Sequence, residues 1–282
     1  MSLSNSGREQ PPPTLLQTEN LSKRFGGLMA VDSVSFELTE QAIMGLVGPN
    51  GAGKTTVFNL ISGYYQPDEG KIFLDGQPLE ALQPFEVAAL GIARTFQNLQ
   101  TFGNMTALEN VMVGRHLHSR TGLLAAALRL PSVQQEDRRT REDAAQHLDR
   151  MGLSARAEEL ASNLSFGEQR RLEICRALAS EPRLLLLDEP CAGLTQEERQ
   201  HLADMIKGIR EQGVTVLLVE HDVDLVMGLA DQVLVLDYGR LIAHGTPQEV
   251  QTDPRVIEAY LGTGWDSAEP ADGHSQPAGP RS

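Results

Sequence analysis

The sequence predicts an α/β fold built around a phosphate-binding loop, and three observations support this. The run Gly48-Pro49-Asn50-Gly51-Ala52-Gly53-Lys54-Thr55-Thr56 satisfies the pattern G-x-x-x-x-G-K-[ST]. Apolar residues before it predict a buried strand, and apolar residues after it predict a helix, which is the context that the pattern requires. Later, unbroken apolar runs alternate with helical segments, which favours a parallel sheet covered on both faces. These runs are Leu184–Leu187, Val214–Val219 and Val233–Leu236.

The elements between these motifs predict two further parts of the fold. Residues 31–38 alternate with period two, which predicts a half-buried antiparallel strand, and residues 71–76 predict a strand that enters an Asp-Gly turn. Residues from about 98 to 165 carry helix-like patterns and predict an inserted helical subdomain. Within it, residues 136–151 are strongly charged and predict a largely exposed helix. Residues 122–128 are expected to pack in this subdomain, with an interaction surface as the alternative.

Composition limits the function classes and the domain organisation. We expect a disordered leader over residues 1–13, one folded domain over residues 14–263 and a disordered tail over residues 264–282. The balance of 24 basic and 38 acidic residues, a formal net charge of −14, argues against a sequence-independent nucleic-acid binder. The two cysteines have no ligand spacing, which fits a reducing compartment. No apolar run approaches the roughly 18 residues of a membrane span, so we expect membrane attachment only through partners.

The phosphate-binding loop predicts a nucleoside triphosphate and Mg²⁺ as ligands. Its glycines let backbone N–H groups turn towards phosphate oxygens, and the helix start adds partial positive charge. Lys54 is expected to reach the β- and γ-phosphates, and the hydroxyl of Thr55 to bind Mg²⁺. An ordinary glycine-rich turn is the alternative interpretation.

Two adjacent carboxylates follow the apolar run that ends at Leu187. In phosphate-loop enzymes an Asp at such a strand end completes the Mg²⁺ shell, which indicates this role for Asp188. Glu189, one residue on, is placed to orient and deprotonate an attacking water. The alternative is a buried strand that ends in a solvated acidic turn.

A third motif covers residues 163–171. Ser165 and Glu168 fit the helix capping box S-x-x-E, so a well-capped helix is predicted here. A Ser and the backbone amide of Gly167 at a helix start also form an anion site, and both interpretations are compatible.

Taken in order, these motifs resemble the nucleotide-binding subunit of an ATP-binding-cassette (ABC) transporter, over about residues 15 to 262. Leu164–Gln169 resembles the family's signature motif L-S-G-G-Q, and Gln97 resembles the Q-loop glutamine. His221 resembles the switch histidine, and Phe25 resembles the aromatic residue that stacks on adenine. A strand-end polar residue at Gln97 and a core residue at Phe25 are the alternatives.

The resemblance implies a set of roles. Catalysis is expected from Glu189, His221, Lys54 and Gln97, with Glu189 as general base and His221 at the γ-phosphate. Mg²⁺ is expected to be bound by Thr55, Asp188 and Gln97. ATP is expected to contact Phe25, Gly48, Pro49, Asn50, Gly51, Ala52, Gly53, Lys54, Thr55 and Thr56 of one chain, and Ser165, Gly167 and Glu168 of a second chain stacked head to tail.

Local matches narrow the resemblance to the ATPases of branched-chain amino acid importers. They include Arg24–Leu28, Arg94–Gln97, Glu189–Leu194, Glu220–Asp222 and Ala259–Gly262. This implies ATP hydrolysis that drives uptake of branched-chain or related amino acids, on the cytoplasmic face of the cell membrane as a peripheral subunit. The implied partners are two integral membrane permease subunits, a second ABC ATPase and a solute-binding receptor, with no nucleic acid. A heterodimer is expected, and a homodimer is the alternative.

Three other functions stay open on the sequence alone: the ATPase of a urea or short-amide importer, a soluble ABC ATPase without a transport role, and a non-enzymatic nucleotide-binding regulator. Two residues also depart from the family pattern. Phe166 stands where the signature usually has its first glycine and adds bulk beside the nucleotide. Thr195 stands where the family usually has Asp, which puts an intersubunit polar contact in question.

Overall fold

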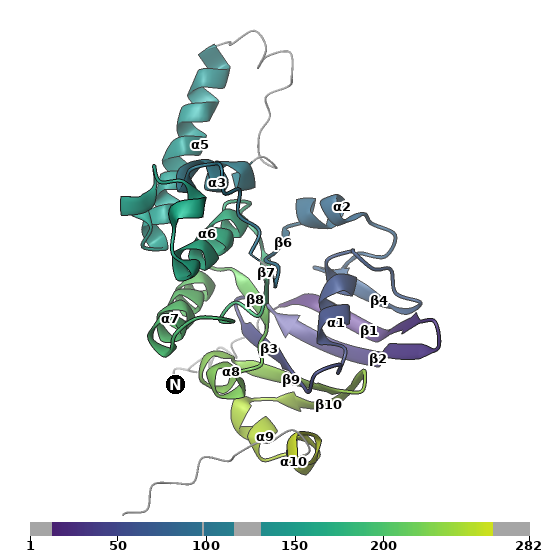
Figure 1. Cartoon of the computed structure of the whole chain (residues 1–282). Coiled ribbons are helices and arrows are strands. Elements are labelled where there is room, and N and C mark those ends of the chain that lie inside the picture. Colours follow the sequence, from purple (N-terminus) through teal and green to yellow (C-terminus); the bar gives the residue numbers. More distant parts are fainter. Residues whose placement is uncertain (1–12, 98, 116–130, 262–282) are drawn as a thin grey trace, which may run out of the picture.

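The chain folds into two β-sheets with helices packed around and beyond them (Figure 1). The computed structural model describes residues 13–97, 99–115 and 131–261. The strands are β1 (Thr14–Phe25), β2 (Leu28–Thr39), β3 (Ile43–Val47), β4 (Glu69–Leu74), β5 (Gln77–Pro78), β6 (Ile92–Arg94), β7 (Leu184–Asp188), β8 (Thr215–Val219), β9 (Gln232–Asp237) and β10 (Arg240–Gly245). The helices are α1 (Lys54–Ile61), α2 (Pro84–Ala89), α3 (Ala107–Gly114), α5 (Pro131–Arg150), α6 (Phe166–Leu178), α7 (Gln196–Glu211), α8 (Val223–Leu229), α9 (Pro247–Gln251) and α10 (Pro254–Leu261), with 3₁₀ turns at Ser154–Arg156 and Ala161–Asn163.

The six-stranded sheet has the order β10-β9-β3-β8-β7-β6. All neighbouring pairs from β9 to β6 are parallel, and β10 is antiparallel to β9, so the sheet is mixed. Because parallel strands end at the same edge, the segments after β3, β7 and β8 emerge together. The predicted phosphate loop, acidic pair and switch histidine occupy these three segments.

The four-stranded sheet has the order β2-β1-β4-β5 and is antiparallel. The strand predicted at residues 31–38 is confirmed, and it forms most of β2. The strand predicted at residues 71–76 is confirmed as β4, which ends before the turn at Asp75-Gly76.

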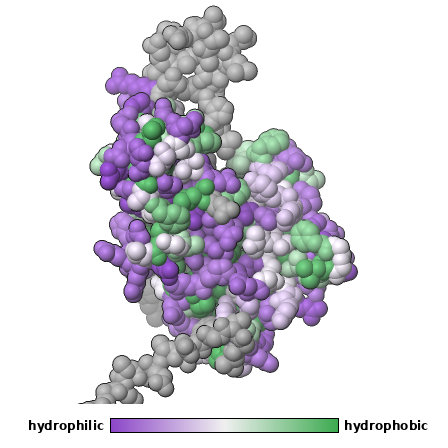
Figure 2. Space-filling view, in the orientation of Figure 1, coloured by the Kyte–Doolittle hydropathy of each residue, from purple (hydrophilic) through white to green (hydrophobic). Residues whose placement is uncertain are grey.

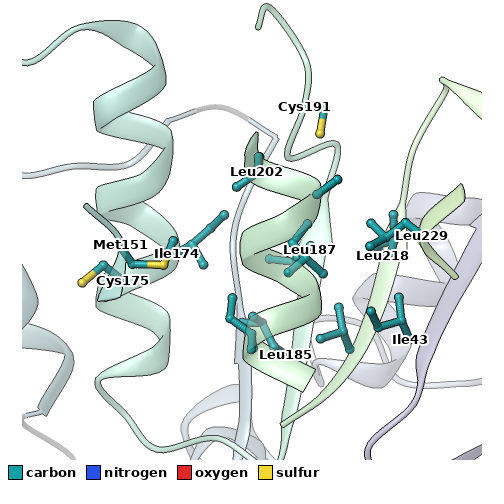
Figure 3. Packing of buried hydrophobic residues seen from close by; sticks show 14 of the residues in the cluster. Ile43, Met151, Ile174, Cys175, Leu185, Leu187, Cys191, Leu202, Leu218 and Leu229 are labelled. Carbon is teal, nitrogen blue, oxygen red and sulfur yellow. The ribbon is translucent and has the colours of Figure 1, made fainter. Parts of the chain in front are cut away.

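The core lies on both faces of the six-stranded sheet, because the side chains of a strand alternate between faces. On one face Leu185, Leu187 and Leu218 pack with residues from α6, α7 and α8, including Ile174 and Leu202 (Figure 3). On the other face a second cluster joins the sheet to α1 and the antiparallel sheet. All residues of β3, β7 and β8 are buried, as the unbroken apolar runs predict.

Helices α3, α5 and α6 form the helical part of the molecule, and Figure 1 shows α3 and α5 beyond α6, away from the sheets. The charged helix predicted at residues 136–151 is confirmed as α5, whose side chains from residue 138 onward are mostly exposed. Ala144 and Leu148 are its buried contacts. The predictions for residues 122–128, for residues 1–12 of the leader and for the tail at 264–282 lie outside the described residues.

Candidate nucleotide site

The phosphate-binding loop connects β3 to α1 and depends on glycine at two close approaches. A Cβ atom on Gly53, whose φ is +103°, would lie 2.4 Å from the carbonyl oxygen of Ala30. A Cβ atom on Gly48 would lie 2.2 Å from the carbonyl oxygen of Leu236. Helix α1 begins directly after this loop without a side-chain cap, so its first backbone amides stay available to an anion. The loop therefore fits a phosphate chain.

Lys54 is the first residue of α1, and its ammonium group lies over the loop. Its Nζ donates hydrogen bonds to the carbonyl oxygens of Gly48 (2.6 Å) and Pro49 (3.1 Å). Burial lowers the pKa of the Lys54 ammonium group, while the neighbouring Glu189 and Asp188 carboxylates oppose that shift. Thr55 follows in the same helical turn and is exposed at the mouth of the site.

Asp188 ends β7 and is almost fully buried, with 3% of its surface exposed. Its Oδ2 forms an ion pair with a terminal nitrogen of Arg94 at 2.9 Å. Arg94 also donates to Asn59 Oδ1 (2.6 Å) and Ser62 Oγ (3.0 Å), both carried by or next to α1. The guanidinium thus joins β6, the helix of the phosphate loop and the predicted Mg²⁺ ligand.

Three aromatic rings surround the same guanidinium. Its central carbon lies 5.7 Å from the ring centres of Phe58 and Tyr64, and 5.3 Å from that of Phe96. These distances are those of cation–π contacts. The sequence motif that contains Arg94 gave this residue no role of its own. An arginine at the end of a buried strand nevertheless indicates a buried acidic partner, which is Asp188 here.

Glu189, Gln97 and His221 come together, as the resemblance implies. The carboxylate of Glu189 accepts a hydrogen bond from Gln97 Nε2 at Oε2 (3.0 Å) and lies 2.7 Å from His221 Nε2 at Oε1. The Glu189 side chain is 13% exposed, whereas that of His221 is 49% exposed. Glu189 also has a left-handed backbone, with φ of +50°, which is rare for a residue with a side chain of this kind. Two neighbours from separate loops thus orient one carboxylate at the sheet edge.

Glu220 is a residue of this site that sequence reasoning missed. It is buried and precedes His221, and its carboxylate accepts hydrogen bonds from the backbone N–H groups of Cys191 (2.6 Å) and His221 (3.3 Å). Burial raises the pKa of Glu220 above its ordinary value of 4.5. Because it bonds to both segments, Glu220 fixes the loop after Glu189 against the loop of His221. The sequence did contain an indication of its burial. Glu220 directly follows β8, a strand whose residues are all apolar except Thr215.

The signature segment forms the helix cap that the sequence predicts. Ser165 Oγ accepts from the N–H of Glu168 (3.3 Å), and Glu168 Oε2 accepts from the N–H of Ser165 (2.8 Å). Arg156 Nε donates to the other carboxylate oxygen of Glu168 at 3.0 Å. Within the described residues, the hydrogen bonds of Ser165 and Glu168 do not reach Gln97, Glu189 or His221. The structure therefore confirms the cap, and the nucleotide contact of Ser165, Gly167 and Glu168 stays a prediction.

The two departures from the family pattern have local partners. The ring of Phe166 packs on Gly193, 3.0 Å from the position that a Cβ atom would take there. Thr195 is the N-cap of α7, where its Oγ1 accepts from the N–H of Glu198 (3.3 Å). Both residues thus contribute to the structure of their own chain.

Phe25 lies at the end of β1 and is 42% exposed, so it is not a core residue. Its ring meets Tyr65 edge to face, with ring centres 5.2 Å apart. Figure 2 shows hydrophobic surface at the tip of the β1–β2 hairpin, where Leu28 is 68% exposed. An exposed aromatic pair suits a flat apolar ligand such as adenine, and Tyr65 is a member that sequence analysis missed.

This combination of phosphate loop, buried Asp and glutamate held by glutamine and histidine defines an ATPase of the ABC class. Residues 31–192 match the family described as "ABC transporter", and residues 240–266 match "Branched-chain amino acid ATP-binding cassette transporter". The chain belongs to the ABC transporter family of ATP-hydrolysing proteins.

Named relatives and solved structures agree with this assignment. The chain is 45% identical to the high-affinity branched-chain amino acid transport ATP-binding protein LivG of Escherichia coli K12, over 88% of this chain and 98% of the relative. It is 44% identical to BraF of Pseudomonas aeruginosa, with the same coverage. An ATP-binding cassette of an ABC transporter in its ADP conformation superposes with a TM-score of 0.77 at 32% identity, covering 88% of this chain and 99% of that one. The fold, the family and the ATPase activity expected from the sequence are confirmed.

Proposed function

We propose that the chain is the ATP-hydrolysing subunit of an importer for branched-chain or related amino acids. The cargo class is supported by the relatives, which are named branched-chain amino acid transport ATP-binding proteins. The observation that carries the hydrolytic role is the carboxylate of Glu189 held between Gln97 and His221. A carboxylate oriented by two neighbours beside a phosphate loop suits a general base for water.

The residues at the sheet edge have separate roles in hydrolysis. Lys54 and the loop amides neutralise phosphate charge, and Thr55, Asp188 and Gln97 offer the hard oxygen ligands that suit Mg²⁺. When bound there, Mg²⁺ supplies charge neutralisation and orientation of the phosphates. A proton passes from the attacking water to a carboxylate oxygen of Glu189, and His221 contacts the γ-phosphate.

The hydrogen bond between Gln97 and Glu189 joins a residue expected to bind Mg²⁺ to the proposed general base. Gln97 now donates to Glu189 Oε2 through its amide nitrogen. Gln97 would bind Mg²⁺ through its amide oxygen, while its amide nitrogen donates to Glu189. Glu189 keeps free lone pairs on its carboxylate oxygens, so it can accept a proton in this arrangement.

We further propose that ATP is held between two chains. Ser165, Gly167 and Glu168 of one chain complete the site of the other, so ATP stabilises the closed pair and hydrolysis lets it reopen. A related cassette, 25% identical with a TM-score of 0.70, is described as a dimer in a post-hydrolysis state bound to ADP and Pi. A second ABC ATPase is the expected partner, with a second copy of this chain as the alternative.

The permease subunits are proposed to dock where the helical part meets the sheet. A cleft of about 390 Å³ lies there, lined by residues around Gln100–Phe102, by the end of α3 and by α6. Phe102 and Val113 are 43% and 40% exposed in this region, which suits contact with an apolar partner helix. The solute-binding receptor joins through the permeases, and the chain acts as a peripheral subunit at the cytoplasmic face. In the part of the chain that the structure describes, no helix combines the length and apolarity that crossing a membrane requires.

The replacement Glu189→Gln tests the hydrolytic role. The full chain should bind MgATP normally, turn over about 10²–10⁴-fold more slowly and accumulate as a closed dimer. Glu197→Gln, an exposed glutamate in the first turn of α7, serves as the matched control and should keep wild-type turnover. Near-normal ATPase activity of Glu189→Gln would remove Glu189 from this role.

Uptake by the reconstituted transporter tests the cargo. Proteoliposomes containing the chain, its co-purified permeases and the receptor should take up labelled leucine when MgATP is supplied. Uptake of labelled urea or acetamide instead of leucine would assign the chain to the short-amide importers, and failure to co-purify with membrane proteins would argue for a soluble ABC ATPase.

A further inference from the structure

Helix α6 carries two oppositely charged side chains that are almost completely buried. Arg170 and Glu173 lie one turn apart, and their side chains are 2% and 1% exposed. Arg170 Nη1 and Glu173 Oε2 form an ion pair at 3.0 Å. Neither residue belongs to the nucleotide site described above, although their helix begins with the signature segment.

Both side chains hold the backbone of the Q-loop. Arg170 donates to the carbonyl oxygens of Phe96 (3.1 Å) and Gln97 (3.2 Å). Glu173 Oε1 accepts from the N–H of Phe96 at 3.3 Å. We call this set of contacts, from Arg170 and Glu173 to residues 96–97, the α6 clamp. The clamp binds main-chain atoms of Gln97, whereas the side chain of Gln97 donates to Glu189 in the nucleotide site.

Burying the charged groups of the clamp is unfavourable for folding. Burial raises the pKa of Glu173, and Nε of Arg170 is buried and finds no hydrogen-bond partner among the described residues. A buried ion pair contributes little net stability compared with apolar side chains of similar volume. Here Arg170 and Glu173 also form three hydrogen bonds to the backbone of residues 96–97. The arrangement is therefore better explained by the position it imposes on the Q-loop than by the stability it adds.

The N-terminus of α6 lies at the signature segment. Ser165 caps α6 only five residues before Arg170, so the cap and the clamp lie on one continuous helix of 13 residues. Arg170 also lies over the ring of Phe166, at 5.8 Å, and that ring packs on Gly193 in the loop after Glu189. The clamp thus lies between the backbone of Gln97 and the signature residues.

We propose that Arg170 and Glu173 are positioning residues that make Gln97 and the signature residues of the same chain move together. The proposal rests on the function proposed above, in which Gln97 serves the chain's own ATP and Ser165 serves that of its partner. A shift of Gln97 towards its ligand then carries α6 with it and repositions Ser165 and Gly167. Occupancy of one site is thereby coupled to assembly of the other.

Distance measurements between two spin labels on the full chain test the clamp. Cys175 and Cys191 are buried, so labels can be directed to introduced surface cysteines, Glu158→Cys in the helical part and Lys71→Cys on β4. Labelled chain is diluted with unlabelled chain, so that only distances within one molecule are measured. Each sample is compared with and without MgATP.

The test variants are Arg170→Lys, which puts one ammonium nitrogen in place of the two guanidinium nitrogens that bond Phe96 and Gln97 separately, and Glu173→Gln, which keeps the volume and loses the ion pair. The control is Arg171→Lys on the same helix, because Arg171 bonds the carbonyl oxygen of Met151 in the helical part instead of the Q-loop (3.1 Å). Thermal melting verifies that each variant is folded. Each variant tests the clamp independently, so the test can be carried out with either one if the other does not fold.

We expect MgATP to shift the distance distribution of the wild type and of Arg171→Lys. In Arg170→Lys and Glu173→Gln the shift should fall to less than half, with MgATP affinity within about threefold of the wild type. An undiminished shift in a folded variant would overturn the clamp, as would a wild type that binds MgATP without any shift. A wild type that fails to bind MgATP would instead refute the proposed function, and the clamp with it.

Discussion

The ion pair between Arg94 and Asp188 gives a prediction that links stability to ligand binding. The change Arg94→Met keeps much of the length of the side chain and its contact with three aromatic rings, but it removes the charge. Asp188, 3% exposed, is then left as a buried carboxylate without its cation. Asn59 and Ser62 lose a donor in the same step.

The magnitude follows from the burial of the pair, since the two side chains are 9% and 4% exposed. Removing one partner of a buried ion pair costs about 3–5 kcal/mol, because the remaining charge is desolvated and uncompensated. For a chain of this size about 1 kcal/mol lowers the melting temperature by about 2–4 °C. We therefore expect Arg94→Met to melt about 6–20 °C below the wild type when magnesium is chelated.

Calorimetry or circular dichroism in EDTA and in MgATP provides the assay. Because Mg²⁺ bound at Asp188 would replace the lost positive charge, MgATP should raise the melting temperature of Arg94→Met more than that of the wild type. The matched control is Arg183→Met, whose ion pairs with Glu40 and Asp75 lie on the surface; it should cost at most about 1 kcal/mol. An Arg94→Met chain that melts within about 2 °C of the wild type would refute the reasoning, and a gap that MgATP leaves unchanged would separate Asp188 from Mg²⁺.

Three further outcomes are expected. Because burial raises the pKa of Glu220 above 4.5, the folded chain holds that proton more tightly than the unfolded chain does, and the stability of the wild type falls as pH rises above 4.5. Chemical denaturation should therefore show Glu220→Gln gaining stability relative to the wild type as pH rises above 4.5, and a pH-independent difference would contradict this. Burial raises the pKa of Cys191 to about 12 and also raises that of Cys175, so neither thiol should react with an aromatic disulfide reagent until the chain unfolds. Thr195→Ala should cost about 1 kcal/mol of unfolding free energy through loss of the cap of α7, whereas Thr195→Asp should retain it.

The sequence was sufficient to locate four strands of the six-stranded sheet, β3, β7, β8 and β9. Strands that are buried on both faces carry unbroken apolar runs, so β7 and β8 could be located before the structure was known. The resemblance implied one shared site for Gln97, Glu189 and His221, and the structure brings the three side chains into contact. The strand before Gln97, β6, was not predicted.

The partners of buried charges could not be predicted in the same way. Arg94 bonds a residue 94 positions away, and Glu220 bonds Cys191 across 29 positions. The neighbouring residues in the sequence show that Arg94 and Glu220 are charged side chains next to apolar strands. The identity of their partners depends on how distant segments of the chain pack. The role of Arg170 was missed for a second reason. The capping box of Ser165 and Glu168 accounts for the start of α6, so nothing in the sequence indicated that a later residue of the helix has a distant partner.

The backbone at Glu189 has a consequence for engineering. Its φ of +50° is favourable for glycine and unfavourable for glutamate by about 1 kcal/mol. A library selected only for heat resistance would therefore enrich glycine or asparagine at this position, and every such winner would lack the carboxylate proposed as the base. Thermostable versions of this protein are best sought with position 189 held constant.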